Sequence, residues 1–438
     1  MAIPLIIWAG AALGSYFLSG CGDENDKKKN QKIAAGDGGS TTPPENENEN
    51  GNGFPDESPV NDGPDTFVMI ERVSVSSDGV QQERNPSYNG VGVLTVGKPS
   101  ISADGRFVAF ESLAPNLVPG DNNLHWDVFV RDRSLSQTHR VSVSSDGTEG
   151  NDSTGSASIS ADGRFVAFKS FADDLILEDT NNKLDVFVHD RQMEQTSRVS
   201  VSSRGEEGNR GGSSDLGNIS INADGRFVTF ESAASNLVPE DTNNELDVFV
   251  HDRQTEQTSR ISVSSSGEEG NDSTYNASIS ADGRFVAFHS YASNLVPRDT
   301  NNRPDVFVRD RQTEQTSRIS VSSSGGEANF GSYSPSISAD GRFVTFVSIA
   351  TNLVPEDTNG AMDVFVHDRQ FGKTHRVSVN RNGEESVGDD PNYHFSDASI
   401  SADGRSVAFL SNASDLVPGD TNDAEDVFVV GLDYFFPK

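Results

Sequence analysis

Cysteine is nearly absent from this sequence of 438 residues, since Cys21 is the only one. No disulfide can therefore form within the chain. Basic residues are also scarce: 34 Lys and Arg stand against 67 Asp and Glu, and the formal net charge is −33. Contacts to phosphate backbones need a positive face, so this balance excludes a general nucleic-acid-binding protein. It favours solubility outside the cell and the attraction of cations.

Long apolar runs are missing except at the N-terminus. The segment Ile3–Leu18 is almost uncharged, but it is too short for a membrane-spanning helix and fits the apolar part of a secretory signal peptide. It ends in Leu-Ser-Gly-Cys at residues 18–21, which resembles a bacterial lipobox. The resemblance implies that residues 1–20 are a signal peptide and that Cys21 carries a lipid anchor. The alternative is an incidental cysteine in a leader.

Apolar side chains are also scarce in residues 21–64, where Asn, Glu, Asp, Gly and Pro dominate. Such a composition does not bury enough surface to offset the entropy of ordering. We predict a disordered linker with an r.m.s. reach of roughly 35 Å, which lifts residues 65–438 away from a lipid surface. The expected location is the bacterial cell envelope, on the periplasmic or the surface side of the outer membrane.

Residues 65–438 are organised around a repeat. The stretch Ile-Ser-Ala-Asp-Gly-Arg-Phe-Val-Ala-Phe begins at Ile101 and returns five times with small changes. Its Asp-Gly pairs begin at residues 104, 162, 224, 282, 340 and 403, so the steps between copies are 58, 62, 58, 58 and 63 residues by subtraction. Spacing this even indicates one supersecondary unit that stacks on itself.

Four short strands are predicted in each repeat. In the second copy they are Ala157–Ser160, Phe165–Ser170, Asp185–His189 and Arg198–Ser202. The Asp-Gly pair between the first two is the strongest short hairpin signal. Consecutive apolar residues in the second and third strands predict burial of both faces, whereas the fourth alternates Val with Ser and is expected at a half-exposed outer edge. Four strands per repeat indicate a propeller blade.

The unit Ser-Ala-Asp-Gly-Arg-Phe-Val-Ala-Phe, followed by Asp-Val-Phe-Val-His-Asp-Arg, resembles the TolB-type, WD-repeat-like bacterial propeller repeat. The resemblance covers residues 65–438 and implies an all-β fold, a single six-bladed β-propeller of four-stranded antiparallel blades. It implies little about activity, because propellers carry many functions. We also expect an N-terminal strand to close the ring: Phe67–Val75 copies the end of a blade, and the last blade stops after its third strand, Asp426–Val430.

An Asp-x-Asn-x-x-x-Asp pattern follows the second strand of every repeat. Oxygen ligands at alternating positions of a tight loop are what Ca²⁺ takes. The alternative is that these residues cap turns through their own backbone. The candidate Ca²⁺ ligands are Asp121, Asn123, Asp127, Asp179, Asn181, Asp185, Asp241, Asn243, Asp247, Asp299, Asn301, Asp305, Asp357, Asn359, Asp363, Asp420, Asn422 and Asp426.

The loops after the second and the fourth strands are long, and antiparallel order places both on the same side of a blade. Function is usually built on such loops, so we expect the binding site on this side. A unique site must break the sixfold pattern, and the pattern breaks in the two blades next to the predicted closure. The candidate binding residues there are Arg84, Tyr88, His125, Trp126, Tyr393 and His394. The alternative is that closure of the ring relaxes the pattern.

No Gly-x-Ser-x-Gly, His-Glu-x-x-His or phosphate-binding loop occurs in the sequence, which favours a protein without catalysis. His189, His251 and His367 share one repeat position, but other repeats have Arg131 and Arg309 there. A catalytic base would not be exchanged for arginine, so we predict surface residues at strand ends.

These observations predict a monomeric, lipid-anchored envelope propeller that binds a protein or a cell-surface polymer through its long-loop side, with Ca²⁺ as the one candidate cofactor. The alternative is a hydrolase or lyase that acts on a glycan or a peptide. A third possibility is a rigid spacer in the envelope.

Overall fold

A computed structural model describes residues 71–83, 99–211, 218–386, 398–421 and 426–436. These residues belong to one compact unit, Met69–Lys438. The predicted signal peptide, the lipidated Cys21 and the linker of residues 21–64 lie outside the described residues. Within the described part, no helix is long and apolar enough to cross a membrane.

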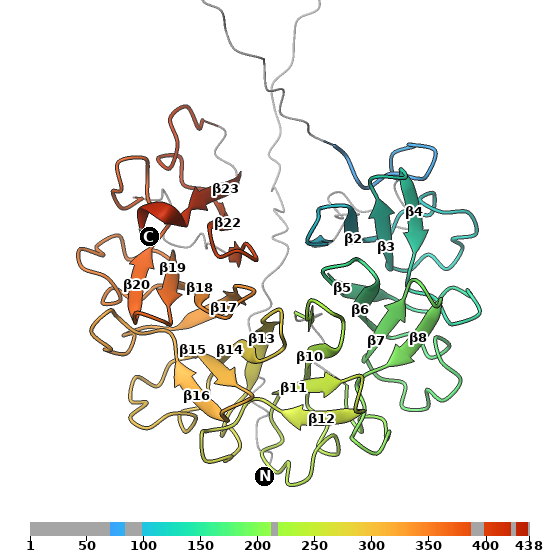
Figure 1. Cartoon of the computed structure of the whole chain (residues 1–438), viewed down its shortest axis with the longest axis horizontal. Coiled ribbons are helices and arrows are strands. Elements are labelled where there is room, and N and C mark those ends of the chain that lie inside the picture. Colours follow the sequence, from blue (N-terminus) through green and yellow to red (C-terminus); the bar gives the residue numbers. More distant parts are fainter. Residues whose placement is uncertain (1–70, 84–98, 212–217, 387–397, 422–425, 437–438) are drawn as a thin grey trace, which may run out of the picture. The chain divides into compact units, whose positions relative to one another are not determined.

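Six antiparallel sheets succeed one another around a common axis, and their fourth strands lie on the outside (Figure 1). This arrangement confirms the predicted six-bladed β-propeller. Five sheets have four strands, and the sheet of blade six has three among the described residues.

The strands follow one another within each blade in sequence order. Blade one contains β1 (Ser100–Ile101), β2 (Phe107–Ser112), β3 (Asp127–Asp132) and β4 (Gln137–Arg140); blade two β5 (Thr154–Ile159), β6 (Phe165–Ser170), β7 (Asp185–Asp190) and β8 (Gln195–Arg198); blade three β9 (Ser220–Ile221), β10 (Phe227–Ser232), β11 (Asp247–Asp252) and β12 (Gln257–Arg260). Blade four contains β13 (Thr274–Ile279), β14 (Phe285–Ser290), β15 (Asp305–Asp310) and β16 (Gln315–Arg318); blade five β17 (Ser332–Ile337), β18 (Phe343–Ser348), β19 (Asp363–Asp368) and β20 (Lys373–Arg376); blade six β21 (Ala398–Ile400), β22 (Ser406–Ser411) and β23 (Asp426–Gly431), followed by the 3₁₀ helix η1 (Leu432–Tyr434).

The second and third strands form the core of each blade, as predicted. They are buried on both faces because each inner blade is covered by two neighbours; every residue of β7 and β11 is buried. The rings of Phe110 and Phe129 stack across the two strands of blade one at a centroid distance of 5.8 Å. Burial of such rings away from water supplies most of the stabilisation.

The fourth strand is shorter and earlier than predicted. β8 ends at Arg198, where the predicted strand begins. The Val199 amide still donates to the Val186 carbonyl of its own blade at 2.8 Å. Two residues later the chain has crossed to blade three, where the Val201 carbonyl accepts a hydrogen bond from the Thr258 hydroxyl. The Val-Ser alternation therefore belongs to the crossing between blades and not to a half-exposed edge strand.

One backbone hydrogen bond recurs at each of five junctions between successive blades. The Ala103 amide of blade one donates to the Ala161 carbonyl of blade two at 2.9 Å, and equivalent pairs continue as far as Ala339 and Ala402. The Phe107 ring packs against Gly163. These contacts fix the first strands of successive blades side by side around the axis.

The junction between blade six and blade one differs from the other five. Among the described residues, no backbone hydrogen bond joins these two blades, which are the two ends of the series in Figure 1. Within the described ranges β23 pairs only with β22, and its Val427 and Val429 are 69% and 71% exposed. Ser406 of blade six occupies the position of Phe107, so blade six lacks the phenylalanine side chain that packs on the next blade.

The predicted ring closure by Phe67–Val75 stays a prediction, because the structure describes only residues 71–75 of this segment. These residues contact blade one: the Glu71 carboxylate pairs with Arg133 at 2.8 Å, and the Val75 carbonyl accepts a hydrogen bond from the Thr138 hydroxyl at 2.5 Å. This segment thus contacts blade one as the end of any blade contacts the next. Residues 67–70 lie outside the described residues.

The three histidines predicted at the surface are buried instead. His189, His251 and His367 are 6%, 1% and 6% exposed. Each Nδ1 lies 2.9 Å from the hydroxyl of a threonine in the fourth strand. Arginine replaces them because it makes the same contact: Arg131 Nη1 donates to the Thr138 hydroxyl at 3.1 Å. The exchange of histidine for arginine is therefore explained by this shared buried contact with threonine and not by a role at the surface.

Candidate functional site

The long-loop face is formed by the loops after the second and fourth strands, residues 113–126 and 141–153 in the first repeat and their equivalents. Hydrogen bonds tie the two kinds of loop together across blades. The Asn151 amide, after β4, donates to Asp174 Oδ1, after β6, at 3.0 Å. The Asn271 amide makes the same bond to Asn294 Oδ1 at 3.0 Å. The two long loops therefore share one side of the propeller, as the antiparallel order predicts.

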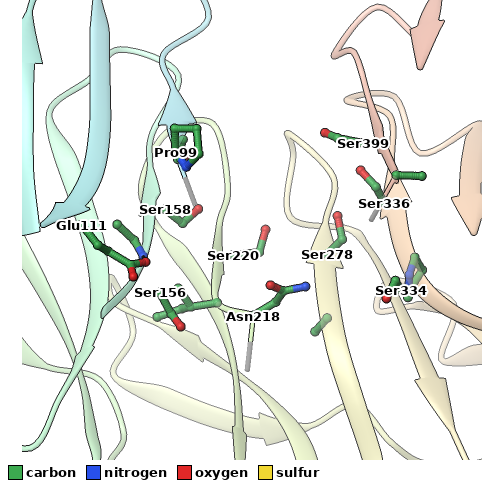
Figure 2. Close-up of a pocket in the computed structure, with 16 residues that line it drawn as sticks. Pro99, Glu111, Ser156, Ser158, Asn218, Ser220, Ser278, Ser334, Ser336 and Ser399 are labelled. Carbon is green, nitrogen blue, oxygen red and sulfur yellow. The ribbon is translucent and has the colours of Figure 1, made fainter. Parts of the chain in front are cut away.

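A cavity of about 290 Å³ lies on the axis, with a wall made by the first strands of all six blades (Figure 2). The wall is mostly polar. One serine at the same repeat position comes from each blade: Ser100, Ser158, Ser220, Ser278, Ser336 and Ser399. The other lining residues are Pro99, Glu111, Ser156, Ala157, Asn218, Ile219, Ala277, Ser334, Pro335 and Ala398.

The serine hydroxyls of the cavity wall are oriented by the neighbouring blade. The Ile159 amide of blade two donates to Ser100 Oγ at 3.1 Å, and the Ile221 amide of blade three donates to Ser158 Oγ at 3.2 Å. The same bond recurs at three further junctions. An oxygen that accepts from the backbone leaves its own O–H free to donate. The wall thus offers a ring of hydroxyl donors to a ligand.

Strained backbone borders this cavity in three blades. Ser156, Asn276 and Ser334 have φ values of 56°, 54° and 49°. Each lies where the pairing of the first and second strands shifts register, at a β-bulge. A non-glycine residue in this conformation costs on the order of 1 kcal/mol, and bulges often re-aim side chains next to active or binding sites.

The fifth residue of the second strand breaks the sixfold symmetry around the axis. Its side chain is acidic, basic, imidazole or apolar depending on the blade: Glu111, Lys169, Glu231, His289, Val347 and Leu410. The first four are buried. Glu231 Oε1 accepts a hydrogen bond from the Asn276 amide at 2.6 Å, and Glu111 Oε1 accepts one from the Ala157 amide at 3.2 Å. Each carboxylate therefore binds the bulge of the next blade.

Lys169 and Glu231 form a buried pair of opposite charge on blades two and three. They are 1% and 2% exposed, and neither Lys169 Nζ nor Glu231 Oε2 has a hydrogen-bond partner in the described part of the chain. Burial lowers the pKa of Lys169 and raises the pKa of Glu231, while the charge of each opposes the shift of the other. Blades one to four thus place ionisable groups near the cavity, whereas blades five and six place apolar ones.

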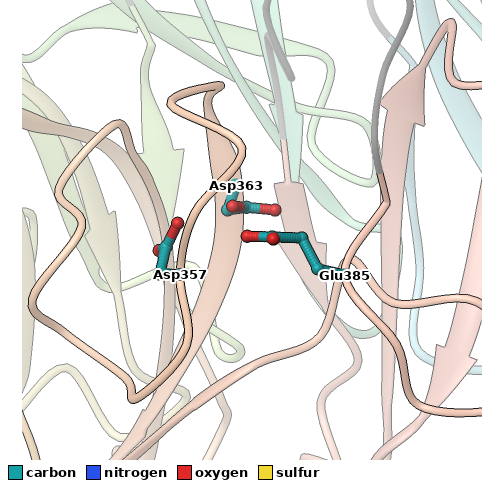
Figure 3. Close-up of side chains that lie close together, drawn as sticks. All are labelled: Asp357, Asp363 and Glu385. Atoms are coloured by element: carbon teal, nitrogen blue, oxygen red, sulfur yellow. The ribbon is translucent and has the colours of Figure 1, made fainter.

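The predicted calcium loops hold an arginine. In blade five, ligand oxygens of Asp357, Asp363 and Glu385 lie within 4.8 Å of one another (Figure 3). Nη1 of Arg376 stands among them, 3.4 Å from Asp357, 3.3 Å from Asp363 and 2.5 Å from Glu385. A Ca²⁺ ion there would have to displace the guanidinium, so these residues do not fit the ion while the arginine is in place.

The same network recurs in blades one to four. Its central arginines are Arg140, Arg198, Arg260 and Arg318. The asparagine of the motif is also used within the loop: Asn123 Nδ2 donates to Asp127 and its Oδ1 accepts from the His125 amide at 2.8 Å. In blade six, Asn422 lies outside the described residues.

Crowding of carboxylates in these networks favours a proton on one of them. Burial, followed by the charge of Asp363, raises the pKa of Asp357 to about 7. Burial and the equivalent neighbour raise the pKa of Asp121, Asp179, Asp241 and Asp299 to about 6. A group that is partly protonated near neutral pH is a weaker metal ligand.

Two of the six predicted binding residues lie in the described part. His125 Nδ1 is 3.3 Å from the Ser153 hydroxyl, and the Trp126 carbonyl accepts the Thr154 amide at 2.7 Å. Trp126 is half-buried, at a position where blades two and three have Leu184 and Leu246. A role of Trp126 in binding stays a prediction. Arg84, Tyr88, Tyr393 and His394 lie outside the described residues.

Sequence inspection missed the fifth position of the second strand and the residues around it. The signal was present, because an alignment of the six copies shows one column that holds Glu, Lys, Glu, His, Val and Leu between invariant neighbours. The column lies inside a strand, where variation is ordinarily ascribed to packing, so the sequence alone does not mark it as functional.

Six blades around a polar axial cavity define the class: this protein is a β-propeller. No known family model matches the sequence, and no curated protein matches it. Among solved structures, the chain is similar to TolB from Acinetobacter baumannii, with 15% identity, a TM-score of 0.37, and 64% of this chain and 53% of that chain covered. The chain thus spans about half of that TolB.

Two further solved structures share the likeness. The TolB structure from Agrobacterium tumefaciens has 15% identity and a TM-score of 0.41, with 77% of this chain and 90% of that chain covered. The β-propeller domain of the trilobed protease from Pyrococcus furiosus has 12% identity and a TM-score of 0.45, with 77% and 79% covered. TolB proteins are thus among the structures to which the chain is similar.

Proposed function

We propose that this protein is a non-catalytic, monomeric β-propeller that is anchored in the bacterial envelope through a lipid on Cys21 and binds a protein or a surface polymer at its axial cavity. The carrying observation is the cavity, whose wall combines oriented serine hydroxyls with the carboxylate of Glu111. A cavity of this size with a few convergent polar groups is the usual form of a ligand site.

The composition of the cavity wall favours binding over catalysis. Among the described lining residues, Glu111 is the only carboxylate, and none is a histidine, lysine or cysteine. Hydrolysis or elimination on a glycan or peptide needs an acid and a base that converge on one bond. The alternative enzymatic function therefore has less support than binding.

The experiment compares retention of the purified full chain on immobilised bacterial envelope before and after a substitution in the cavity. Asn218→Arg fills the cavity with a long side chain, and we expect it to reduce retention at least tenfold. The control is Met193→Arg, in the turn between β7 and β8 on the opposite face, where Met193 is 57% exposed. Equal retention of wild type and Asn218→Arg would overturn the proposal.

A further inference from the structure

Three of the seven tyrosines of the chain surround His289 on the long-loop side of blades four and five. The His289 ring stacks on Tyr275 at a centroid distance of 5.5 Å. It meets Tyr333 and Tyr291 at larger interplanar angles, at 5.6 Å and 6.4 Å. Tyr275 and Tyr291 also contact each other edge to face at 6.1 Å. These four residues are the tyrosine cluster.

The tyrosine cluster borders the axial cavity. Tyr333 is followed directly by Ser334 and Pro335, and both of these residues line the cavity. On the blade-four side, Tyr275 stands two residues before Ala277, which also lines it. The cluster therefore lies next to the part of the cavity wall that blades four and five supply.

Part of the tyrosine cluster is open to solvent. Tyr291 is 46% exposed, and Phe330, in the loop before β17, is 39% exposed. Phe330 is not part of the tyrosine cluster, but Arg303 links it to the cluster. The Arg303 guanidinium lies 5.6 Å from the Phe330 ring, and its charge opposes the rise that burial causes in the pKa of the Tyr333 hydroxyl. Exposed aromatic rings next to an arginine are typical of binding surfaces.

His289 gives the cluster an unmet hydrogen-bonding capacity. His289 is 6% exposed, and its Nδ1 has no hydrogen-bond partner among the described residues. Burial lowers the pKa of His289 to about 4, so the imidazole is neutral at pH 7. A buried polar atom without a partner is unfavourable in the folded chain.

We propose that the tyrosine cluster is a subsite for a neutral, hydroxyl-rich glycan chain, the next sugar units of which occupy the axial cavity. This inference rests on the proposed function and names its ligand. The faces of the tyrosine rings stack on the C–H face of a sugar ring. The serine hydroxyls and the Glu111 carboxylate of the cavity then bind the sugar hydroxyls.

Charge and size select this class of ligand. A net charge of −33 repels a polyanionic glycan, so a neutral one is favoured. A cavity of about 290 Å³ accommodates a few sugar units, whereas a folded protein partner makes a broad contact of roughly 800 Å² on each side. Protein binding at the cluster is the competing outcome of the test.

The experiment measures binding of cellohexaose, chitohexaose and hexagalacturonate to the full chain by calorimetry. We expect a neutral hexasaccharide to bind and the double variant Tyr291→Ala, Phe330→Ala to lose about tenfold in affinity. Both side chains are exposed, so the variant should unfold at the same temperature as wild type. Phe171→Ala is the matched control, because Phe171 occupies the position of Tyr291 in blade two and is 41% exposed.

Binding of a neutral hexasaccharide that weakens in the double variant and not in Phe171→Ala supports the proposal. Three calorimetric results overturn it: no binding of any probe, a preference for hexagalacturonate, or an equal loss of affinity in the control. Retention on envelope also overturns it if that retention depends on Tyr291 and Phe330 but is destroyed by prior proteolysis of the envelope, because the ligand is then a protein. If Asn218→Arg still removes retention in these cases, the glycan assignment fails while the proposed function stands.

Discussion

The Cδ2 atom of Phe107 lies 2.1 Å from the position that a Cβ atom would take on Gly163. Phe107 belongs to blade one and Gly163 to the Asp-Gly turn of blade two. The turn that joins the first two strands of one blade is therefore also the packing site for a phenylalanine of the preceding blade. Gly163 has a φ of 73°, and glycine is required there both for that conformation and for the approach of the ring.

Gly163→Ala is expected to destabilise the protein by about 2–4 kcal/mol, because the new methyl group must displace the Phe107 ring and the backbone conformation disfavours alanine. Gly105→Ala is the matched control. Gly105 holds the same repeat position in blade one with a φ of 70°, but its nearest neighbour to a Cβ is Arg133 Nη1 at 3.7 Å. We expect a loss of only about 1 kcal/mol there. Chemical denaturation measures both, and equal losses would contradict the packing argument.

The parts of the fold that follow from local chemistry were predictable from the sequence. The strand Phe165–Ser170 was predicted at its observed bounds, because an Asp-Gly turn and a continuous apolar run define both its start and its face. The fourth strand was misplaced because Val199 and Val201 look like a strand in isolation, and only the neighbouring blade shows that the chain is crossing.

The candidate site was less predictable because it depends on register between strands. His289 meets Tyr275 through pairing of β14 with β13, and it meets Tyr333 through packing of blade four on blade five. The two tyrosines lie 14 residues before and 44 residues after the histidine by subtraction. No spacing rule links them, whereas the structure places the ring centroids of Tyr275 and Tyr333 5.5 Å and 5.6 Å from that of His289.

His367→Arg is expected to remove one source of acid sensitivity. Burial lowers the pKa of His367 to about 4, below the value of about 6.5 in the unfolded chain. The folded state therefore binds fewer protons between pH 4 and pH 6.5, and stability is lost as the pH falls through this window. The loss amounts to about 2 kcal/mol at pH 5.

Arginine should fit the position of His367, since Arg309 at the same place in blade four donates to the Thr316 hydroxyl and to the Ser264 carbonyl. Urea denaturation at pH 7 and pH 5 measures the effect. We expect the variant to match wild type within about 1 kcal/mol at pH 7 and to exceed it at pH 5. The reverse change, Arg309→His, should add a similar acid sensitivity. Parallel pH profiles for wild type and His367→Arg would refute the assignment.

Cys21→Ser tests the proposed anchor. If Cys21 carries the lipid, wild type should sediment with membranes and incorporate radiolabelled palmitate, whereas the variant should stay in the soluble fraction without label. Several acyl chains hold a protein firmly, and their loss leaves the acidic propeller nothing with which to bind an anionic surface. Ser19→Ala serves as the control for changes in the leader. Membrane retention of Cys21→Ser at the wild-type level would exclude a lipid anchor at this residue.

Removal of the arginine from the acidic loop of blade five should open a cation site at the place where the guanidinium now stands. In Arg376→Gln the oxygens of Asp357, Asp363 and Glu385 lose the guanidinium that now stands 2.5 to 3.4 Å from them. Three carboxylates without a counter-charge repel one another, so the variant should be destabilised in a chelator and regain stability in about 5 mM Ca²⁺. Wild type should melt at the same temperature within about 1 °C in both conditions. The same variant should show pH-dependent Ca²⁺ binding. Because the pKa of Asp357 is raised to about 7, Ca²⁺ binding to the variant should release a proton and strengthen from pH 6 to pH 8. Calorimetric titration of both proteins with Ca²⁺ measures this effect. Binding of several ions by wild type would show that Ca²⁺ displaces the arginines, and it would restore the calcium sites that the sequence predicts.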